Sequence, residues 1–104
     1  MSEMIYRTLP HGGEQISVIG LGMGYIHENG RAEAEATVRM ALDRGVNYLD
    51  LAAGDGSAYP AVARAIDGRR EQVYVQMHFG AVYDGGAYGW TRDLRRMKNS
   101  FASQ

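Results

Sequence analysis

Two ionisable residues of this sequence stand where strands are expected to end. Asp50 closes the short apolar segment 46–50, and His78 lies near the end of the alternating segment 73–79. Functional groups of α/β proteins gather outside the carboxyl ends of parallel strands. A carboxylate beside an imidazole can move protons there, because imidazole titrates near neutral pH. Asp50 and His78 are therefore candidate catalytic residues, although Asp50 could instead cap the following loop and His78 could instead bond to backbone groups at the end of its strand.

The face on which these two side chains lie follows from the alternation of strands. Tyr48 shares a face with Asp50, and Tyr74 and Gln76 share a face with His78. Neighbouring strands lie about 4.8 Å apart, which lets the carboxylate reach a ring nitrogen directly or through one water. If the two strands are adjacent and parallel, we predict that Asp50 and His78 point to the same inner face.

Other polar residues offer alternatives. Asp55 is flanked by glycines, which favours a turn. Tyr59 is a less favoured substitute acid that would lean towards Asp50. His27 with Asp50 and His78 suggests a metal site, but these residues lack helical ligand spacing, so we predict no metal.

Aromatic and basic clusters near the C-terminus allow two interpretations each. Tyr83, Tyr88 and Trp90 either pack a loop against helices or stack on a ligand, and we favour packing. The dense basic cluster consists of Arg92, Arg95, Arg96 and Lys98. A solvated helix face explains it best, because a net charge of −1 argues against nucleic-acid binding.

The elements that must position these residues alternate between strand and helix. In order, the patterns predict a hairpin of 4–9 and 15–18, a strand at 19–22, a helix from 34 to Gly45, a strand at 46–50, a loop at 51–58, a helix at 60–66 before Gly68, a strand at 73–79, a loop at 80–89 and a helix at 94–101. Such alternation implies parallel pairing with right-handed crossovers.

Apolar spacing assigns the faces of these elements. The first helix has an apolar stripe of Ala34, Val38, Ala41 and Leu42. The third strand is expected to place Val73, Val75, Met77 and Phe79 on one face. The last helix is expected to have Thr91 as its cap and a stripe of Leu94, Met97 and Phe101.

A glycine-rich stretch, 20–24, invites a dinucleotide-binding interpretation with Asp50 as the ribose-binding acid. That motif requires the helix to begin within the glycines, so that its N-terminus meets the pyrophosphate. Here residues 25–30 intervene, and the third glycine is not at the required place. We therefore disfavour this alternative.

Composition bounds the protein class. The chain has 104 residues, of which 45% are hydrophobic and 22% charged, as in an ordinary globular domain. Cysteine is absent, which excludes disulfides and thiolate metal ligands. No apolar run approaches the ~20 residues of a membrane span. We expect one incomplete domain over 1–104, without a membrane partner and located in the cytoplasm.

Three stretches together resemble bacterial aldo-keto reductases. They are 6–9 with 16–22 (YRTL and ISVIGLG), 45–50 (GVNYLD) and 62–73 (VARAIDGRREQV), in the family's order. The resemblance implies a (β/α)8 barrel, which typically needs ~250 residues. It thus predicts an α/β fold, namely a partial TIM-type barrel with an N-terminal hairpin, about three βα units and a parallel sheet.

The resemblance also assigns roles. Asp50 matches the family's catalytic aspartate, Asp55 occupies the place of its proton-donating tyrosine, and His78 occupies that of its lysine. Gly22 and Met23 fall where the family's chain approaches the nicotinamide. The implied activity is NAD(P)H-dependent interconversion of a small carbonyl substrate and an alcohol, with NADP(H) as cofactor and with altered Tyr and Lys positions.

We consider two alternative functions, an enzyme and a module that acts by association. The first is an aldo-keto-reductase-like oxidoreductase of which this chain is the N-terminal portion. The second is a catalytically inactive module that self-associates or assembles with a missing C-terminal part, because an unclosed parallel sheet exposes its edges. In either case we expect the 104-residue chain alone to be inactive and not to bind NADP(H).

Overall fold

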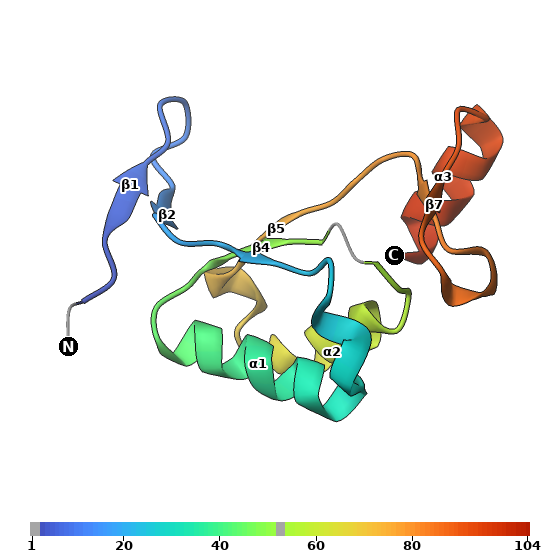
Figure 1. Cartoon of the computed structure of the whole chain (residues 1–104). Helices are drawn as coiled ribbons and strands as arrows, with labels where there is room; N and C mark the ends of the chain where they lie inside the picture. Colours follow the sequence, from blue (N-terminus) through green and yellow to red (C-terminus); the bar gives the residue numbers. More distant parts are fainter. Residues whose placement is uncertain (1–2, 52–53) are drawn as a thin grey trace.

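The chain forms a hairpin, a parallel sheet covered by two helices, and a C-terminal unit built on a third helix, as Figure 1 shows. This computed structural model describes residues 3–51 and 54–104. The elements are β1 (Tyr6–Thr8), β2 (Gln15–Ser17), β3 (Leu21–Gly22), the 3-10 turn η1 (Ile26–Asn29), α1 (Arg31–Asp43), β4 (Tyr48–Asp50), α2 (Ala58–Ala65), η2 (Arg70–Gln72), β5 (Tyr74–Gln76), β6 (Ala81–Val82), η3 (Asp84–Gly86), β7 (Gly89–Trp90) and α3 (Leu94–Ser103). Residues 52–53 of the predicted loop at 51–58 lie outside the described residues.

The central sheet has the order β3-β4-β5, and all its strands are parallel. Leu49 of β4 lies between Leu21 of β3 and Val75 of β5. The helices α1 and α2 are the crossovers that bring each strand back parallel to the one before it. The predicted α/β class, N-terminal hairpin and parallel βα units are therefore confirmed.

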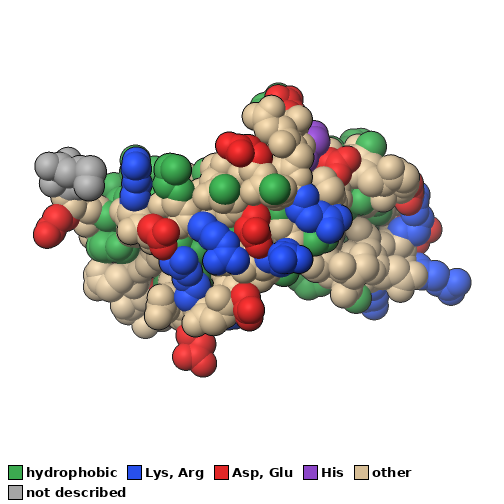
Figure 2. Space-filling model, turned by 90° about the horizontal axis from the view of Figure 1, so that it is seen from below, with side chains coloured by type: hydrophobic (Ala, Val, Ile, Leu, Met, Phe, Trp, Pro, Cys, Tyr) green, Lys and Arg blue, Asp and Glu red, His purple; other side chains and the backbone are tan. Residues whose placement is uncertain are grey.

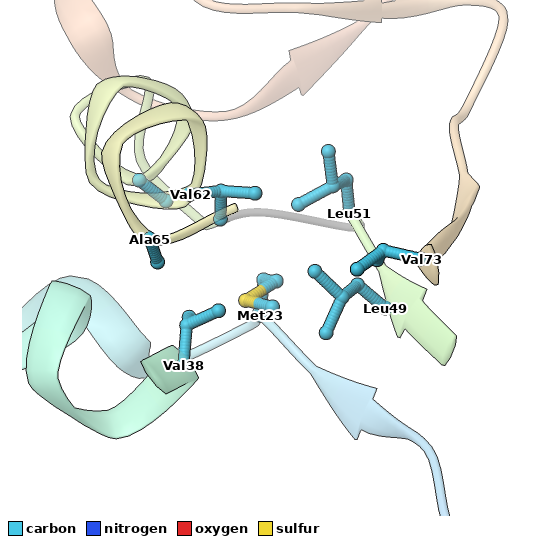
Figure 3. Close-up of a cluster of buried hydrophobic side chains, with 8 residues drawn as sticks. Met23, Val38, Leu49, Leu51, Val62, Ala65 and Val73 are labelled. Carbon is cyan, nitrogen blue, oxygen red and sulfur yellow. The ribbon is translucent and has the colours of Figure 1, made fainter. Parts of the chain in front are cut away.

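The helices α1 and α2 lie on one side of the sheet, and the other side is uncovered in Figure 1. The core lies between the sheet and these two helices, as Figure 3 shows. Its buried members are Met23, Val38, Leu49, Leu51, Ala58, Val62, Ala65 and Val73. Because strand side chains alternate, Tyr48 and Asp50 must face away from this core. The inner face of a barrel-like sheet is thus left open.

The helix α1 ends as its sequence predicts. Ala34 and Val38 are buried, and Gly45 has a φ of 98°, a conformation that side chains with a Cβ rarely adopt. A Cβ at Gly45 would also lie 2.9 Å from the Cβ of Met4. This glycine therefore turns the chain into β4 and lets the N-terminal segment pass close by.

The C-terminal third differs from the predicted arrangement. The strand β5 ends at Gln76, so Phe79 is not on the core face but is 52% exposed, with its ring 5.6 Å from that of Phe101. The predicted loop at 80–89 contains a small antiparallel hairpin of β6 and β7. Two-residue strands carry too little alternation to be recognised in a sequence.

The helix α3 also requires two corrections. Its N-cap is Asp93, whose carboxylate accepts hydrogen bonds from the backbone N–H groups of Arg95 and Arg96. Thr91 instead accepts a hydrogen bond from the N–H of Asp93. The apolar stripe exists, but none of its residues is buried, and Leu94 is 56% exposed. Only part of the stripe is covered, where the ring of Phe101 meets that of Phe79.

The helix side of the molecule carries both charge signs intermingled, as Figure 2 shows. Glu35 lies between Arg39 and Arg64, at 3.4 and 3.2 Å, and Asp43 pairs with Arg69 at 3.0 Å. Exposed pairs of this kind contribute about 0–1 kcal/mol each. This face is therefore an ordinary solvated surface.

Among the described residues, no helix is both long enough and apolar enough to cross a lipid bilayer.

Candidate functional site

The predicted pair of Asp50 and His78 is present at the carboxyl ends of β4 and β5. The Nε2 atom of His78 lies 2.8 Å from Oδ1 of Asp50, and both side chains are 38% exposed. Asp50 lies opposite Gln76, the last residue of β5, and His78 follows two residues beyond the end of that strand. The predicted arrangement of the two side chains is confirmed.

The hydrogen bond of this pair determines which ring nitrogen is left for chemistry. Because Nε2 of His78 is held by Asp50, Nδ1 is the nitrogen that remains available. Within residues 3–51 and 54–104, no hydrogen bond to Nδ1 is found. A carboxylate that holds one ring nitrogen orients the imidazole ring. The pair is therefore suited to donating or accepting a proton at Nδ1.

A cleft of about 410 Å³ runs along the edge strand β3 beside Asp50. Its lining includes Ser17, Gly20, Gly22 and Tyr48. A Cβ built on Gly22 would meet nothing within 4 Å, so a flat group has room over this residue. The cleft thus lies against one of the two positions predicted to approach a nicotinamide.

Met23, the other predicted cofactor position, has a side chain that faces away from the cleft. It is fully buried in the core that Figure 3 shows, and its backbone N–H donates a 3.1 Å hydrogen bond to the carbonyl of Asp50. Only the backbone of Met23 is therefore placed to meet a cofactor. The residue also ties β3 to the end of β4, on which Asp50 lies.

Asp55 is held in a turn at the start of α2. Its Oδ1 atom accepts a 2.8 Å hydrogen bond from the N–H of Ser57, and its backbone forms a bridge with Ala87. Hydrogen bonds from the side chain and the backbone of Ser57 hold the pKa of the Asp55 carboxyl below its ordinary value. A carboxylate that stays ionised near pH 7 does not donate a proton. The catalytic role of Asp55 stays a prediction, and this geometry favours the turn.

Three loops at the carboxyl end of the sheet are tied together around Asp55. The N–H of Gly56 donates to the carbonyl of Gly86 at 2.7 Å, and the N–H of Tyr88 donates to the carbonyl of Gly54 at 3.3 Å. A Cβ on Gly54 would lie only 2.3 Å from the carbonyl oxygen of Gly24. The close approach of these loops therefore depends on a glycine at position 54.

We expect Gly54→Ala to destabilise the chain by about 1–3 kcal/mol, because the added methyl group would force the backbone of Gly24 to move. Urea denaturation followed by circular dichroism measures the effect. Gly22→Ala is the matched control, since a Cβ there meets nothing within 4 Å. Equal denaturation midpoints for the two variants would show that the loops do not approach each other in this way.

A group of tyrosines packs beside these loops. The hydroxyls of Tyr59 and Tyr83 lie 2.9 Å apart, their rings meet edge to face, and the ring of Tyr88 lies 5.9 Å from that of Tyr83. Burial raises the pKa of both Tyr59 and Tyr83. The Tyr59 hydroxyl also lies 3.4 Å from the carbonyl of Leu51. This arrangement supports packing rather than acid catalysis by Tyr59.

Trp90 lies apart from the packed tyrosines, whereas the ring of His27 lies beside Gly54, next to the loops around Asp55. Trp90 is 67% exposed and lies under the guanidinium of Arg92, at 5.8 Å from the ring centroid. The Nδ1 atom of His27 is buried and has no hydrogen-bond partner within 3–51 and 54–104. The described residues contain no group of three or more His, Asp or Glu side chains that could hold a metal ion.

Sequence reasoning missed the loop connections and the hydrogen bond between two tyrosines. A signal for the first was present, because glycines recur in all three loops, at positions 24, 54, 56, 85 and 86. Gly85 and Gly86 have positive φ values of 66° and 89°. The hydrogen bond between Tyr59 and Tyr83 left no such signal, since the two residues are 24 positions apart.

Comparison with known proteins places this geometry in context. No model of a protein family matches the sequence. The chain is 40% identical, over 87 residues, to an aldo-keto reductase of Mycobacterium sp. (strain MCS), a stretch that covers 81% of this chain and 29% of that protein. It is 44% identical, over 68 residues, to a 6-dehydroglucose reductase of Novosphingobium aromaticivorans, which covers 61% of this chain and 22% of the relative.

The fold has a counterpart among solved structures. An aldo-keto reductase from Bacillus halodurans, solved in its holo form, superimposes with a TM-score of 0.74 at 22% identity. The match covers 96% of this chain and 35% of that barrel protein, so the chain has the fold of a partial (β/α) barrel. It spans about a third or less of each protein that it matches. In sequence and in fold the chain is therefore similar to part of an aldo-keto reductase barrel.

Proposed function

We propose that this chain supplies part of the active site of an oxidoreductase that interconverts a carbonyl group and an alcohol with NADP(H). The observation that carries the proposal is the 2.8 Å contact between His78 and Asp50 at the carboxyl ends of adjacent parallel strands. The relatives' printed names, aldo-keto reductase and 6-dehydroglucose reductase, support the reaction class.

Reduction of a carbonyl requires a hydride at carbon and a proton at oxygen. In this proposal protonated His78 donates the proton from Nδ1, and Asp50 orients the ring through Nε2 and stabilises its charge. Neutral His78 then regains a proton from solvent, to which its side chain is 38% exposed. In this proposal Asp55 remains a carboxylate and helps to hold the loops at the carboxyl end of the sheet together.

The cleft beside Asp50 fits only part of a nicotinamide cofactor. When bound, the nicotinamide supplies the hydride, and the open space over Gly22 is where its ring would lie. The cleft lining contains no lysine or arginine. The cofactor's phosphates therefore need residues from elsewhere in a complete barrel.

A chimeric barrel tests this function. The 87-residue match in the Mycobacterium aldo-keto reductase is replaced by the corresponding segment of this chain, and NADPH consumption is followed with a small aldehyde. We expect turnover that depends on both NADPH and aldehyde, with the parent enzyme as positive control. A folded chimera that is inactive while the parent is active would contradict the proposal.

The 104-residue chain alone should neither bind nor oxidise NADPH measurably, because barrel active sites are built from loops of many strands and this sheet has three. Titration of NADPH, followed by its fluorescence, provides the measurement. A protein-free titration is the control. A saturable signal at micromolar cofactor would show that the cleft beside Gly22 is a sufficient binding site.

A second candidate function is an inactive module that survives by association. The position of Asp55 favours it, because the residue in the tyrosine's place is engaged with Ser57 and stays ionised. If every folded chimera is inactive, the reductase function is contradicted and the inactive module is the function that is supported. For either function we propose a cytoplasmic location.

A further inference from the structure

An asparagine is followed by glycine at one place in the sequence, Asn29–Gly30. A backbone nitrogen can attack the side-chain carbonyl of an asparagine that precedes it, and glycine hinders this attack least because it has no side chain. The pair lies at the junction of the 3-10 turn η1 and the helix α1, and both residues are exposed. The sequence and the position therefore favour a reaction between the two residues.

The local structure leaves the Asn29 amide and the space beside Gly30 open. Within residues 3–51 and 54–104, no hydrogen bond to the side chain of Asn29 is found. A Cβ built on Gly30 would meet nothing within 4 Å. The N–H of Gly30 donates a 3.1 Å hydrogen bond to the carbonyl of His27, at the end of the four-residue turn η1. Such bonds have poor geometry and open at little cost, so the nitrogen becomes available by local opening.

The other asparagines of the sequence, Asn47 and Asn99, are placed differently. The Oδ1 atom of Asn47 accepts from the N–H of Ser17, and its Nδ2 atom donates to the carbonyl of Gln15, both at 2.8 Å. Asn99 lies inside the helix α3. Attack on either side chain requires a strand or a helix to open first, which costs more than opening the end of a short turn.

We propose that Asn29 is a modification site at which this chain deamidates without an enzyme. The Gly30 nitrogen loses its proton and bonds to Cγ of Asn29, the bond from Cγ to Nδ2 breaks, and ammonia leaves. A water molecule then opens the cyclic imide at either of its carbonyls, which gives aspartate or isoaspartate. The reaction needs only water and does not depend on the proposed reductase function.

The aspartate product supplies a charge at the start of α1. The N-cap residue of this helix is Gly30, which has no side chain to accept a hydrogen bond from the first N–H groups. A carboxylate beside the N-terminus of a helix is favourable, because the helix dipole is positive there. Isoaspartate instead adds a carbon atom to the backbone between η1 and α1. Conversion to aspartate therefore strengthens the start of α1.

Incubation of the 104-residue chain in heavy-oxygen water at mildly alkaline pH tests the site. Trypsin separates the three asparagines into the peptides 8–31, 45–64 and 99–104, and mass spectrometry measures the uptake of solvent oxygen in each. We expect uptake in 8–31 to be roughly tenfold faster than in the other two, or more. Asn29→Gln is the control and should abolish it, because the longer side chain closes the ring poorly. Equal rates in the three peptides, or uptake that persists in Asn29→Gln, would overturn the proposal.

Two charge variants test the effect on α1. Asn29→Asp reproduces the product, and Asn29→Lys places the opposite charge at the same position. We expect the urea midpoint at low salt to be higher for Asn29→Asp than for Asn29→Lys, and the difference to shrink as salt is added. Circular dichroism verifies that both variants fold. Equal or reversed midpoints would show that the product does not strengthen the start of α1.

Discussion

Leu49→Ala should lower the free energy of unfolding by about 2–5 kcal/mol and leave much of the chain unfolded at room temperature. Leu49 is fully buried at the centre of the core that Figure 3 shows, between Leu21 and Val75 of the neighbouring strands. Its removal leaves a cavity under the middle strand. Small domains have total stabilities near the lower end of about 5–15 kcal/mol, so the loss is a large fraction.

Urea denaturation followed by far-ultraviolet circular dichroism measures this loss. Leu94→Ala is a matched control with the same chemical change on a residue that is 56% exposed, and it should alter stability by less than about 0.5 kcal/mol. If Leu49→Ala and Leu94→Ala have the same denaturation midpoint, the core does not lie between the sheet and the two helices. A lower slope of the Leu49→Ala curve would indicate a loss of cooperativity.

His78→Ala should reduce kcat of the active chimeric barrel by about 10²- to 10⁴-fold, the usual contribution of a positioned proton donor. The reason is the 2.8 Å contact between Nε2 of His78 and Asp50, which leaves Nδ1 as the proton-donating atom. Asp50→Asn should also lower kcat, because an amide cannot stabilise the imidazolium by charge. Steady-state NADPH consumption at saturating aldehyde measures both effects.

Two further variants of the chimera make this result specific. His78→Lys introduces the residue that the family resemblance places at this position, and it should retain turnover where His78→Ala does not. His11→Ala removes an exposed histidine of the hairpin turn and should leave kcat unchanged. Full activity of the His78→Ala chimera would show that the pair with Asp50 is structural and that another group supplies the proton.

The sequence alone determined the order of the helices and of the strands up to β5, and the location of the pair of Asp50 and His78. Period-two alternation placed each residue on a face, and the succession of strands and helices required parallel neighbours. Those two rules suffice for β4 and β5, because both strands carry apolar residues on the core side. The register that places Asp50 opposite Gln76 follows from the same burial.

Local signals were ambiguous where two residues could serve the same purpose. Thr91 and Asp93 are both good caps, and the choice of Asp93 depends on its extended backbone before α3. The stripe of α3 predicted a buried face, although burial requires a neighbouring surface that periodicity does not reveal. The hairpin of β6 and β7 lacked a pattern because its strands have two residues each.

Only the tertiary structure decided what the loops do with the remaining candidates. It buried the side chain of Met23, turned the carboxylate of Asp55 towards Ser57 and joined the hydroxyls of Tyr59 and Tyr83. These outcomes depend on contacts between loops far apart in the chain, which leave no periodic trace. Regular elements are encoded by repeating patterns that each residue reinforces, whereas a loop side chain is placed by the single neighbour that the fold brings to it.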